Sequence, residues 1–149
     1  FKIIKFRTMH TDAEERLVDL LEKNPKLKAK YEIYHKMNDD PRLTRIGKFL
    51  RKYSFDELPQ FWNVIKGEMS LIGPRSYITW EKIKMNGNEE MILQVKPGIS
   101  GLWQVTDRND SSFEERIMID IYYIRNWSMF LDLYILAKTI KVVITGKGG

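Results

Sequence analysis

The segment that decides the fold is LTRIGKFLRKYSFDELPQFWNVIKGEMSLIGPRS, residues 43–76. Apolar residues recur at helical spacing through its first part, with basic residues between them, which predicts an amphipathic helix ending near Tyr53. A second helix is expected directly afterwards, capped by the side chain of Ser54 or of Asp56. Residues Met69–Ile72 are typical of a short strand. Helices and a strand in so short a stretch indicate a mixed α+β fold.

The residues before this stretch predict one strand and two helices. Phe1–Met9 alternates apolar and basic residues, which favours a short strand. Thr11 and Glu14 have the spacing of a capping box, and Asn24-Pro25 suits the start of a further helix. We therefore expect residues 11–37 to form a helical hairpin laid on the rest of the chain.

The residues after this stretch predict mainly helices. A short helix is expected over Trp80–Met85, a strand over Leu102–Val105 and a helix over Phe113–Ile124. A last, largely apolar helix is expected from its cap at Ser128 to Ile144. The predicted fold class is α+β, a mostly helical single domain with short strands or hairpins and amphipathic helices suited to a membrane surface.

Composition limits the classes of function. The 149 residues are 43% hydrophobic and 30% charged, which fits one domain with a buried core. The formal net charge of +5 permits an anionic partner without choosing one. The absence of cysteine excludes disulfide scaffolds, thiolate zinc sites and cysteine nucleophiles, and two histidines without an HExxH motif argue against a histidine-built zinc site.

The start of the sequence bears on its relation to a membrane. No apolar run of about 18 residues is present, so no part of the sequence is expected to span a bilayer. The chain begins at Phe1 rather than Met, which is typical of a chain cut from a longer protein. We expect the upstream part to have held a membrane anchor, and this fragment to be soluble or peripheral.

Asp56 and Glu57 are the first candidate for chemistry. A carboxylate at a helix start and beside a cation such as Arg51 is favoured in its ionised form, and such a carboxylate can attack phosphorus to form an acyl phosphate. The neighbouring Glu57 could hold Mg²⁺, which prefers hard oxygen ligands and bridges to substrate phosphate. The same pair is also typical of an ordinary first helical turn, so the pattern alone leaves both interpretations open.

Three further features could bind an anion, and each has an ordinary structural alternative. The basic residues of the first helix could meet anionic lipid or form a solvated face; they are Arg45, Lys48, Arg51 and Lys52. The stiff turn Gly73-Pro74-Arg75 could aim a guanidinium at a phosphate or be a plain turn. The segment Lys96–Gly101 has two glycines that would let a nucleotide approach the backbone, but it lacks the P-loop and Rossmann patterns.

Together these motifs are far more specific than any one of them. KFRTM at 5–9, the 43–76 stretch, KPGISGLWQV at 96–105 with Arg108-Asn109, and Asp120–Tyr123 leading to NWSMFLDLYILAKT occur in that order. This string resembles the bacterial sugar transferase family, the monotopic phosphoglycosyl transferases also called undecaprenyl-phosphate hexose-1-phosphate transferases. The resemblance covers nearly the whole chain. It implies a catalytic domain over residues 1–149, with the hairpin as an insertion and the family's N-terminal membrane helix missing upstream.

The resemblance also implies an enzyme and its reaction. A UDP-hexose gives its sugar-1-phosphate to polyprenyl phosphate at the cytoplasmic face of the bacterial membrane, and UMP leaves. The product begins the synthesis of capsule, exopolysaccharide or O-antigen. Asp56 falls on the family's nucleophile and Glu57 on its dyad partner, and both are expected to hold Mg²⁺. The expected substrate-binding residues are Lys5, Arg7, Arg51, Arg75, Lys96, Arg108 and Asp120.

Two other functions remain compatible with the sequence. A metal-dependent glycosyltransferase would hold its metal with Asp39-Asp40 and release UDP. A non-catalytic basic module would bind anionic lipid or nucleic acid with a steep salt dependence. The chain has no basic strand interleaved with aromatic residues of the RNA-binding kind, so no nucleic-acid partner is expected.

Overall fold

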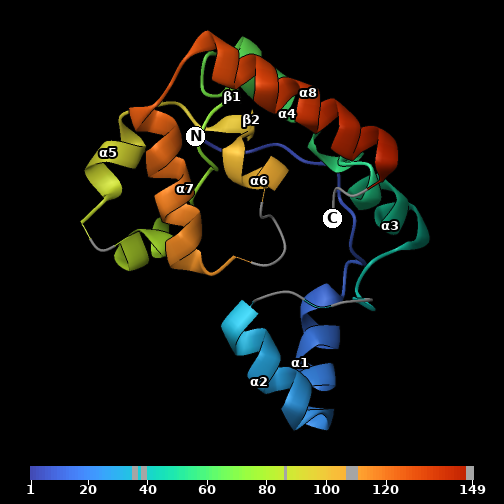
Figure 1. The fold of residues 1–149 in the computed structure, drawn as a ribbon. Helices are drawn as coiled ribbons and strands as arrows, with labels where there is room; N and C mark the ends of the chain where they lie inside the picture. Colours follow the sequence, from blue (N-terminus) through green and yellow to red (C-terminus); the bar gives the residue numbers. More distant parts are fainter. Residues whose placement is uncertain (35–36, 38–39, 86, 107–110, 147–149) are drawn as a thin grey trace.

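Two short parallel strands lie side by side near the middle of the molecule (Figure 1). In this computed structural model β1 is Ser70–Ile72 and β2 is Gly98–Ser100, with Ser70 opposite Gly98 and Ile72 opposite Ser100. The structure describes residues 1–34, 37, 40–85, 87–106 and 111–146. The strand predicted over Met69–Ile72 is thus confirmed.

Helices make up most of the remaining structure, as the fold class predicted. Two of the ten are short 3-10 helices, η1 and η2. Their bounds are α1 Ala13–Lys23, α2 Pro25–Tyr34, α3 Arg45–Lys52, η1 Phe55–Glu57, α4 Gln60–Ile65, η2 Thr79–Met85, α5 Glu89–Leu93, α6 Leu102–Thr106, α7 Phe113–Arg125 and α8 Met129–Thr145. Among the described residues, none of these helices is both long and apolar enough to cross a membrane.

The strand predicted over Leu102–Val105 is wrong, because this segment is helix α6. Leu102 and Trp103 are adjacent and both buried, whereas a strand would place neighbours on opposite faces. The Thr106 hydroxyl also donates to the carbonyl of Leu102, four residues back. The strand lies just upstream, where the glycine-rich sequence favoured a loop.

Those glycines let the backbones approach one another. A Cβ on Gly98 would lie 2.2 Å from the amide nitrogen of Gly73, and a Cβ on Gly101 would lie 2.2 Å from the carbonyl oxygen of Gly73. No side chain fits at these distances. The glycines of the Lys96–Gly101 segment therefore have a structural explanation within the fold, without an approaching nucleotide.

The core consists of two clusters of buried apolar side chains that share helix α7. One cluster joins η2, α5 and α7, and the other joins α6, α7 and α8. The first holds Met85, Ile92, Ile117 and Ile121, and the second holds Leu102, Tyr123 and Ile135. Helix α8 lies across one side of the molecule, over the sheet and α6 (Figure 1).

The segment Phe1–Met9 is extended, but the predicted strand is wrong. Among the described residues its only strand-like pairing is an isolated antiparallel bridge between Met9 and Leu43. The amide of Ile4 instead donates to the side-chain oxygen of Asn63, at 3.2 Å, and Asn63 donates to the carbonyl of Lys2. The backbone groups of this segment thus pair with the buried side chain of Asn63 and with loop carbonyls, and not with a neighbouring strand.

The predicted helical hairpin forms as α1 and α2, but its expected placement is wrong, because it projects away from the rest of the described chain instead of lying on it (Figure 1). Pro25 is the first residue of α2, as predicted, and Asn24 caps it by accepting a hydrogen bond from the amide of Leu27. The predicted Thr11–Glu14 capping box is wrong, since α1 starts after Asp12 without a side-chain cap. His35 and Asp39 lie outside the described residues.

Helix α3 is anchored by its glycine rather than by its apolar side chains. Ile46 is 72% exposed and Phe49 is 53% exposed, while Gly47 is buried. The amide and hydroxyl of Thr44 both donate to the carbonyl oxygen of Thr8. A Cβ on Gly47 would lie 1.9 Å from that same oxygen. The close approach between α3 and the Thr8 backbone therefore requires a residue without a side chain.

Gly47→Ala is expected to destabilise the protein. Glycine to alanine in a free helix stabilises by about 1 kcal/mol, but here the added carbon must push α3 away from Thr8, at a cost of about 2–4 kcal/mol. Urea unfolding measures the difference. Ile46→Ala, on the exposed face of the same helix, is the control and should change stability by less than about 1 kcal/mol. Equal or higher stability of Gly47→Ala would contradict this packing.

Candidate active site

The loop between α3 and α4 carries Asp56 and Glu57 on a tight 3-10 turn. Ser54, just before them, has φ +55°, the only left-handed non-glycine residue in the described part of the chain. Its amide donates to the carbonyl of Arg51, so Ser54 ends α3 in the position that glycine commonly takes. The prediction that Ser54 or Asp56 caps the next helix is wrong, because α4 follows Pro59 without a side-chain cap. A left-handed residue cannot serve as a cap, which needs extended backbone.

The N-terminal segment lies against this turn. Lys5 Nζ forms an ion pair with Glu57 Oε1 at 2.7 Å, and the amide of Phe6 donates to the carbonyl oxygen of Asp56 at 3.0 Å. Arg51 Nε donates to the hydroxyl of Thr8 at 3.0 Å. The structure thus pairs Lys5 with Glu57 and holds Arg51 and the backbone of Asp56 against the same N-terminal segment. We call these four residues the dyad cluster.

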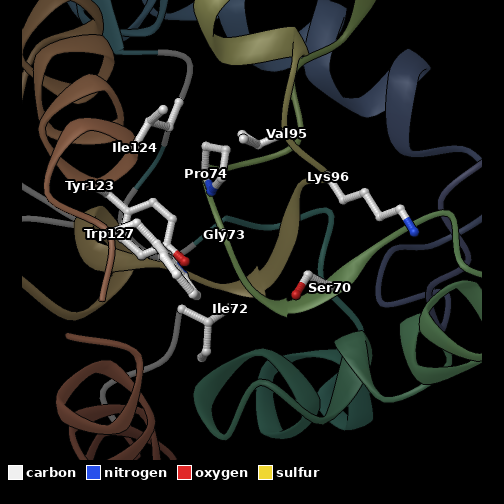
Figure 2. Close-up of a pocket in the computed structure, with 9 residues that line it drawn as sticks. All are labelled: Ser70, Ile72, Gly73, Pro74, Val95, Lys96, Tyr123, Ile124 and Trp127. Carbon is white, nitrogen blue, oxygen red and sulfur yellow. The ribbon is translucent and has the colours of Figure 1, made fainter. Parts of the chain in front are cut away.

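The other predicted substrate-binding residues lie elsewhere. Arg7, in the same extended segment, is exposed. Arg108 lies outside the described residues, so its predicted role stays a prediction. Lys96 lines a cavity of about 330 Å³ with Gly73, Pro74 and the aromatic rings of α7 and its end. Figure 2 shows the Lys96 side chain pointing away from those rings.

Arg75 and Asp120 meet in a second, more buried cluster. Asp120 Oδ2 accepts hydrogen bonds from the Arg75 amide at 3.2 Å and from the Tyr77 hydroxyl at 2.7 Å. The Arg75 guanidinium pairs with Glu81 at 3.3 Å, and Arg116 pairs with the same carboxylate at 3.0 Å. Hydrogen bonds and ion pairs to Asp120 and Glu81 thus hold the Gly73-Pro74-Arg75 turn in place. Asp120 positions Arg75, while contact of either residue with substrate stays a prediction.

Sequence reasoning missed Glu81, Arg116 and Tyr77, although one signal was available. Arg116 precedes Asp120 by four residues, and both lie on the apolar face of α7 with Ile117. Charged residues four apart on a buried helical face indicate a buried polar cluster. The Arg116 guanidinium lies over the rings of Phe113, Tyr77 and Trp103, at 4.4, 5.0 and 5.3 Å from their centroids.

Burial and hydrogen bonding shift the pKa values of the two carboxyl groups in this cluster, Asp120 and Glu81. Burial raises the pKa of Asp120 to about 6, against the opposing effects of the Tyr77 and Arg75 hydrogen bonds and of the Arg116 charge. Asp120 is fully buried, and its Oδ1 has no hydrogen-bond partner among the described residues. Burial also opposes ionisation of Glu81, but the Ile78 amide and the two arginines outweigh it and hold the pKa of that carboxyl below its ordinary value.

Asp120→Asn is therefore expected to change how stability depends on pH. The folded state holds the Asp120 proton more tightly than the unfolded chain, whose ordinary value is 3.8, so this stabilisation is complete below pH 3.8 and is lost as pH rises to about 6. Asparagine cannot titrate. Its stability relative to the native chain should rise by up to about 3 kcal/mol between pH 4 and pH 7 in urea unfolding. Glu81 and the arginines are common to both proteins, so a difference independent of pH would contradict the assignment.

Helix α6 connects the two clusters. The guanidinium carbon of Arg75 lies over the Trp103 ring, 5.8 Å from the centroid of that ring. The next residue, Gln104, lines a second pocket, of about 200 Å³, together with Glu57. Neighbouring residues of one short helix thus reach the Arg75 cluster and the dyad cluster.

The donor set suits Mg²⁺ but not a caged metal. Among the described residues, no three His, Cys, Asp or Glu side chains come together as a metal site. Mg²⁺ is commonly held by one or two carboxylates, several waters and the phosphates of a substrate, so a site at Asp56 and Glu57 would need no further protein ligand; that these two residues hold Mg²⁺ stays a prediction. Asp40 is unsuited, because its carboxylate already binds Arg42 Nε and Nη2 at 2.6–3.0 Å. Burial opposes its ionisation, but these bonds keep the pKa of Asp40 below its ordinary value.

Residues 1–146 match the family described as Bacterial sugar transferase. The chain belongs to that family. It is 47% identical over 148 residues to a UDP-galactose-lipid carrier transferase of Erwinia amylovora, and 43% identical to an undecaprenyl-phosphate galactose phosphotransferase of Salmonella typhimurium; each match covers 99% of this chain and 31% of the relative. An exopolysaccharide production protein ExoY of Sinorhizobium fredii is 42% identical, over 99% of this chain and 66% of the relative. This bacterial sugar transferase chain spans about a third of the length of the first two relatives.

Proposed function

We propose that this chain transfers sugar-1-phosphate from a UDP-hexose to polyprenyl phosphate and releases UMP. The observation that carries the proposal is the dyad cluster, in which a tight turn carries two adjacent carboxylates, Lys5 pairs with that of Glu57, and Arg51 and the Asp56 backbone bond to the same N-terminal segment. Phosphoryl transfer requires a nucleophile and cations that stabilise spreading negative charge. The names of the relatives, which mention UDP-galactose, a lipid carrier and undecaprenyl phosphate, support these substrates.

The reaction proceeds in two displacements at one phosphorus. A carboxylate oxygen of Asp56 attacks the phosphorus that bears the sugar, the bond to the bridging oxygen breaks, and UMP leaves with the electron pair. A phosphate oxygen of the polyprenyl phosphate then attacks the same phosphorus, and the bond to Asp56 breaks to restore the carboxylate. The bond from the anomeric carbon to oxygen is never broken, so the sugar configuration is retained.

The neighbouring residues orient and stabilise the reacting groups. The Thr8 hydroxyl fixes the Arg51 guanidinium, and Asp120 fixes the backbone from which Arg75 projects. Planar guanidinium groups held this way match phosphate oxygens in pairs. Asp56 and Glu57 would hold Mg²⁺, which when bound neutralises charge on the diphosphate.

We further propose that the chain works at the cytoplasmic face of the bacterial membrane. Large apolar side chains along one helix lie exposed, which suits contact with lipid. On α8 these are Met129, Phe130, Leu133, Tyr134, Leu136, Ile140 and Ile144. The other basic residues of α3, Arg45, Lys48 and Lys52, would meet anionic head groups.

A panel of UDP-sugars, incubated with the chain and with polyprenyl phosphate, tests the function. UMP is expected as the nucleotide product, and about one UMP per chain is expected even without lipid, because the first displacement needs none. Release of UDP would contradict the proposal and favour a glycosyltransferase.

Arg51→Lys is expected to lower UMP release by about 10²-fold, because lysine keeps the charge but loses the planar fork that Thr8 orients. Lys48→Ala, on the same helix, is the control; it should leave UMP release unchanged and weaken binding to anionic vesicles. Initial rates with saturating UDP-sugar measure the first effect, and vesicle sedimentation the second. Equal rates for the two variants would remove Arg51 from the catalytic site.

A further inference from the structure

The pocket beside Glu57 has a mostly apolar wall drawn from several elements. The lining residues come from α8, from η1 and the start of α4, and from β2 and α6. We call it the α8 pocket, and its apolar lining includes Phe55, Leu58, Phe61, Val105, Val142 and Val143. Phe61 and Leu58 are about half exposed, so the pocket opens at the surface.

The polar groups of the α8 pocket are mostly already paired. The hydroxyls of Ser100 and Thr139 bond to each other at 2.6 Å, and Thr139 also bonds to the carbonyl of Ile135. Gln104 Oε1 is buried without a hydrogen-bond partner among the described residues. Together with Glu57 and the hydroxyls of Tyr53 and Ser54, this amide is part of a small polar set in a mostly apolar lining. Such a lining is a poor match for a hexose, whose several hydroxyls each need a partner when buried. The lining therefore favours a hydrocarbon.

Positive charge lies at the edges of the α8 pocket. Lys5 forms an ion pair with Glu57, which is one of the lining residues. Lys52 lies above the ring of Tyr53, a lining residue, and beside Gly146 at the end of α8. An apolar hole with cations at its edge complements a molecule that joins a phosphate to a hydrocarbon chain.

We propose that the α8 pocket holds the first isoprene units of the polyprenyl phosphate acceptor, with its phosphate at the Glu57 end. This inference rests on the proposed function. Apolar cavities of about 150 Å³ hold benzene, which has six carbons, so the roughly 200 Å³ here has room for one to two five-carbon isoprene units. The rest of the chain leaves past the exposed apolar residues of α8. Val142 and Val143 then contact the proximal isoprene units.

The direct test is photolabelling of the 149-residue chain with a farnesyl phosphate that carries a diazirine on its second isoprene unit. Label is expected in the peptide that contains Val142 and Val143, or in the peptide of Phe55–Phe61 across the pocket. Val143→Trp should fill the space and reduce that label by about tenfold or more, since burial of the chain drives binding. Ala137→Trp, at an exposed position of the same helix outside the pocket lining, is the matched control and should keep the label.

UMP release from UDP-sugar without lipid is measured in the same variants. Val143→Trp should release UMP like the native chain, because the first displacement does not use the α8 pocket; this also shows that the variant is folded. Loss of UMP release by a folded Val143→Trp would mean that the sugar occupies the pocket, and would overturn the inference. Label confined to the outer face of α8 in the native chain would overturn it as well, whatever the variant does. If the native chain released no UMP but labelled in the pocket, the proposed function would fail and the lipid site would stand.

Discussion

Asp56→Asn is expected to give a folded protein that still binds UDP-sugar and has lost turnover by at least about 10⁴-fold. The backbone contact of this residue, from the Phe6 amide to the Asp56 carbonyl, does not depend on the side chain. The amide has the same size but cannot form an acyl phosphate. Thermal unfolding checks the fold, and UMP release with lipid acceptor measures turnover.

Two further variants complete this experiment. Asp19→Asn makes the same chemical change on the exposed face of α1, where the carboxylate only pairs with Lys23, and should leave turnover unchanged. Asp40→Asn removes a partner of Arg42 and should affect stability more than chemistry. Substantial activity of Asp56→Asn, with activity abolished in a folded Asp40→Asn, would exclude Asp56 as the nucleophile.

Glu57→Gln is expected to lower turnover by about 10²–10³-fold, the second largest effect. The amide loses the charge that pairs with Lys5 at 2.7 Å and that we propose holds Mg²⁺ against the diphosphate. For the native chain, excess chelator should abolish UMP release and added Mg²⁺ should restore it. Initial rates across a Mg²⁺ titration measure both effects.

The matched control for this prediction is Glu22→Gln, an exposed residue of α1, which should behave like the native chain. An undiminished rate in excess chelator would remove the metal from the mechanism. A Glu57→Gln variant with native turnover would leave Glu57 only its ion pair with Lys5.

The local signals in the sequence predicted those elements whose ends are set by their own residues. Ser128 caps α8 by accepting from the amide of Leu131, as expected, and the helix ends at Gly146, with φ +64°, close to the predicted end at Ile144. The two wrong strand predictions have a common cause. Whether Phe1–Met9 or the glycine-rich residues before Leu102 pair as strands depends on partners distant in the sequence, which local pattern does not specify.

The residues of the candidate site also fall into two groups, those close together in sequence and those brought together by tertiary packing. Arg51, Asp56 and Glu57 are close in sequence, so helical spacing alone groups them. The contact of Lys5 with Glu57 spans 52 residues, and that of Glu81 with Arg116 spans 35. Tertiary packing creates these pairs, so the sequence could suggest Lys5 through a family resemblance but could not place it. The left-handed Ser54 was also unforeseen, because its neighbours favoured a helix cap.

The most direct test of the central claim is intact-protein mass spectrometry after incubation of the 149-residue chain with UDP-sugar and Mg²⁺, without lipid. The account predicts a mass gain of one sugar phosphate per chain, matched by one UMP, located on the peptide that contains Asp56. Addition of polyprenyl phosphate should then remove it. Release of UMP with no mass gain, or a mass gain that persists in Asp56→Asn, would contradict a covalent aspartyl intermediate.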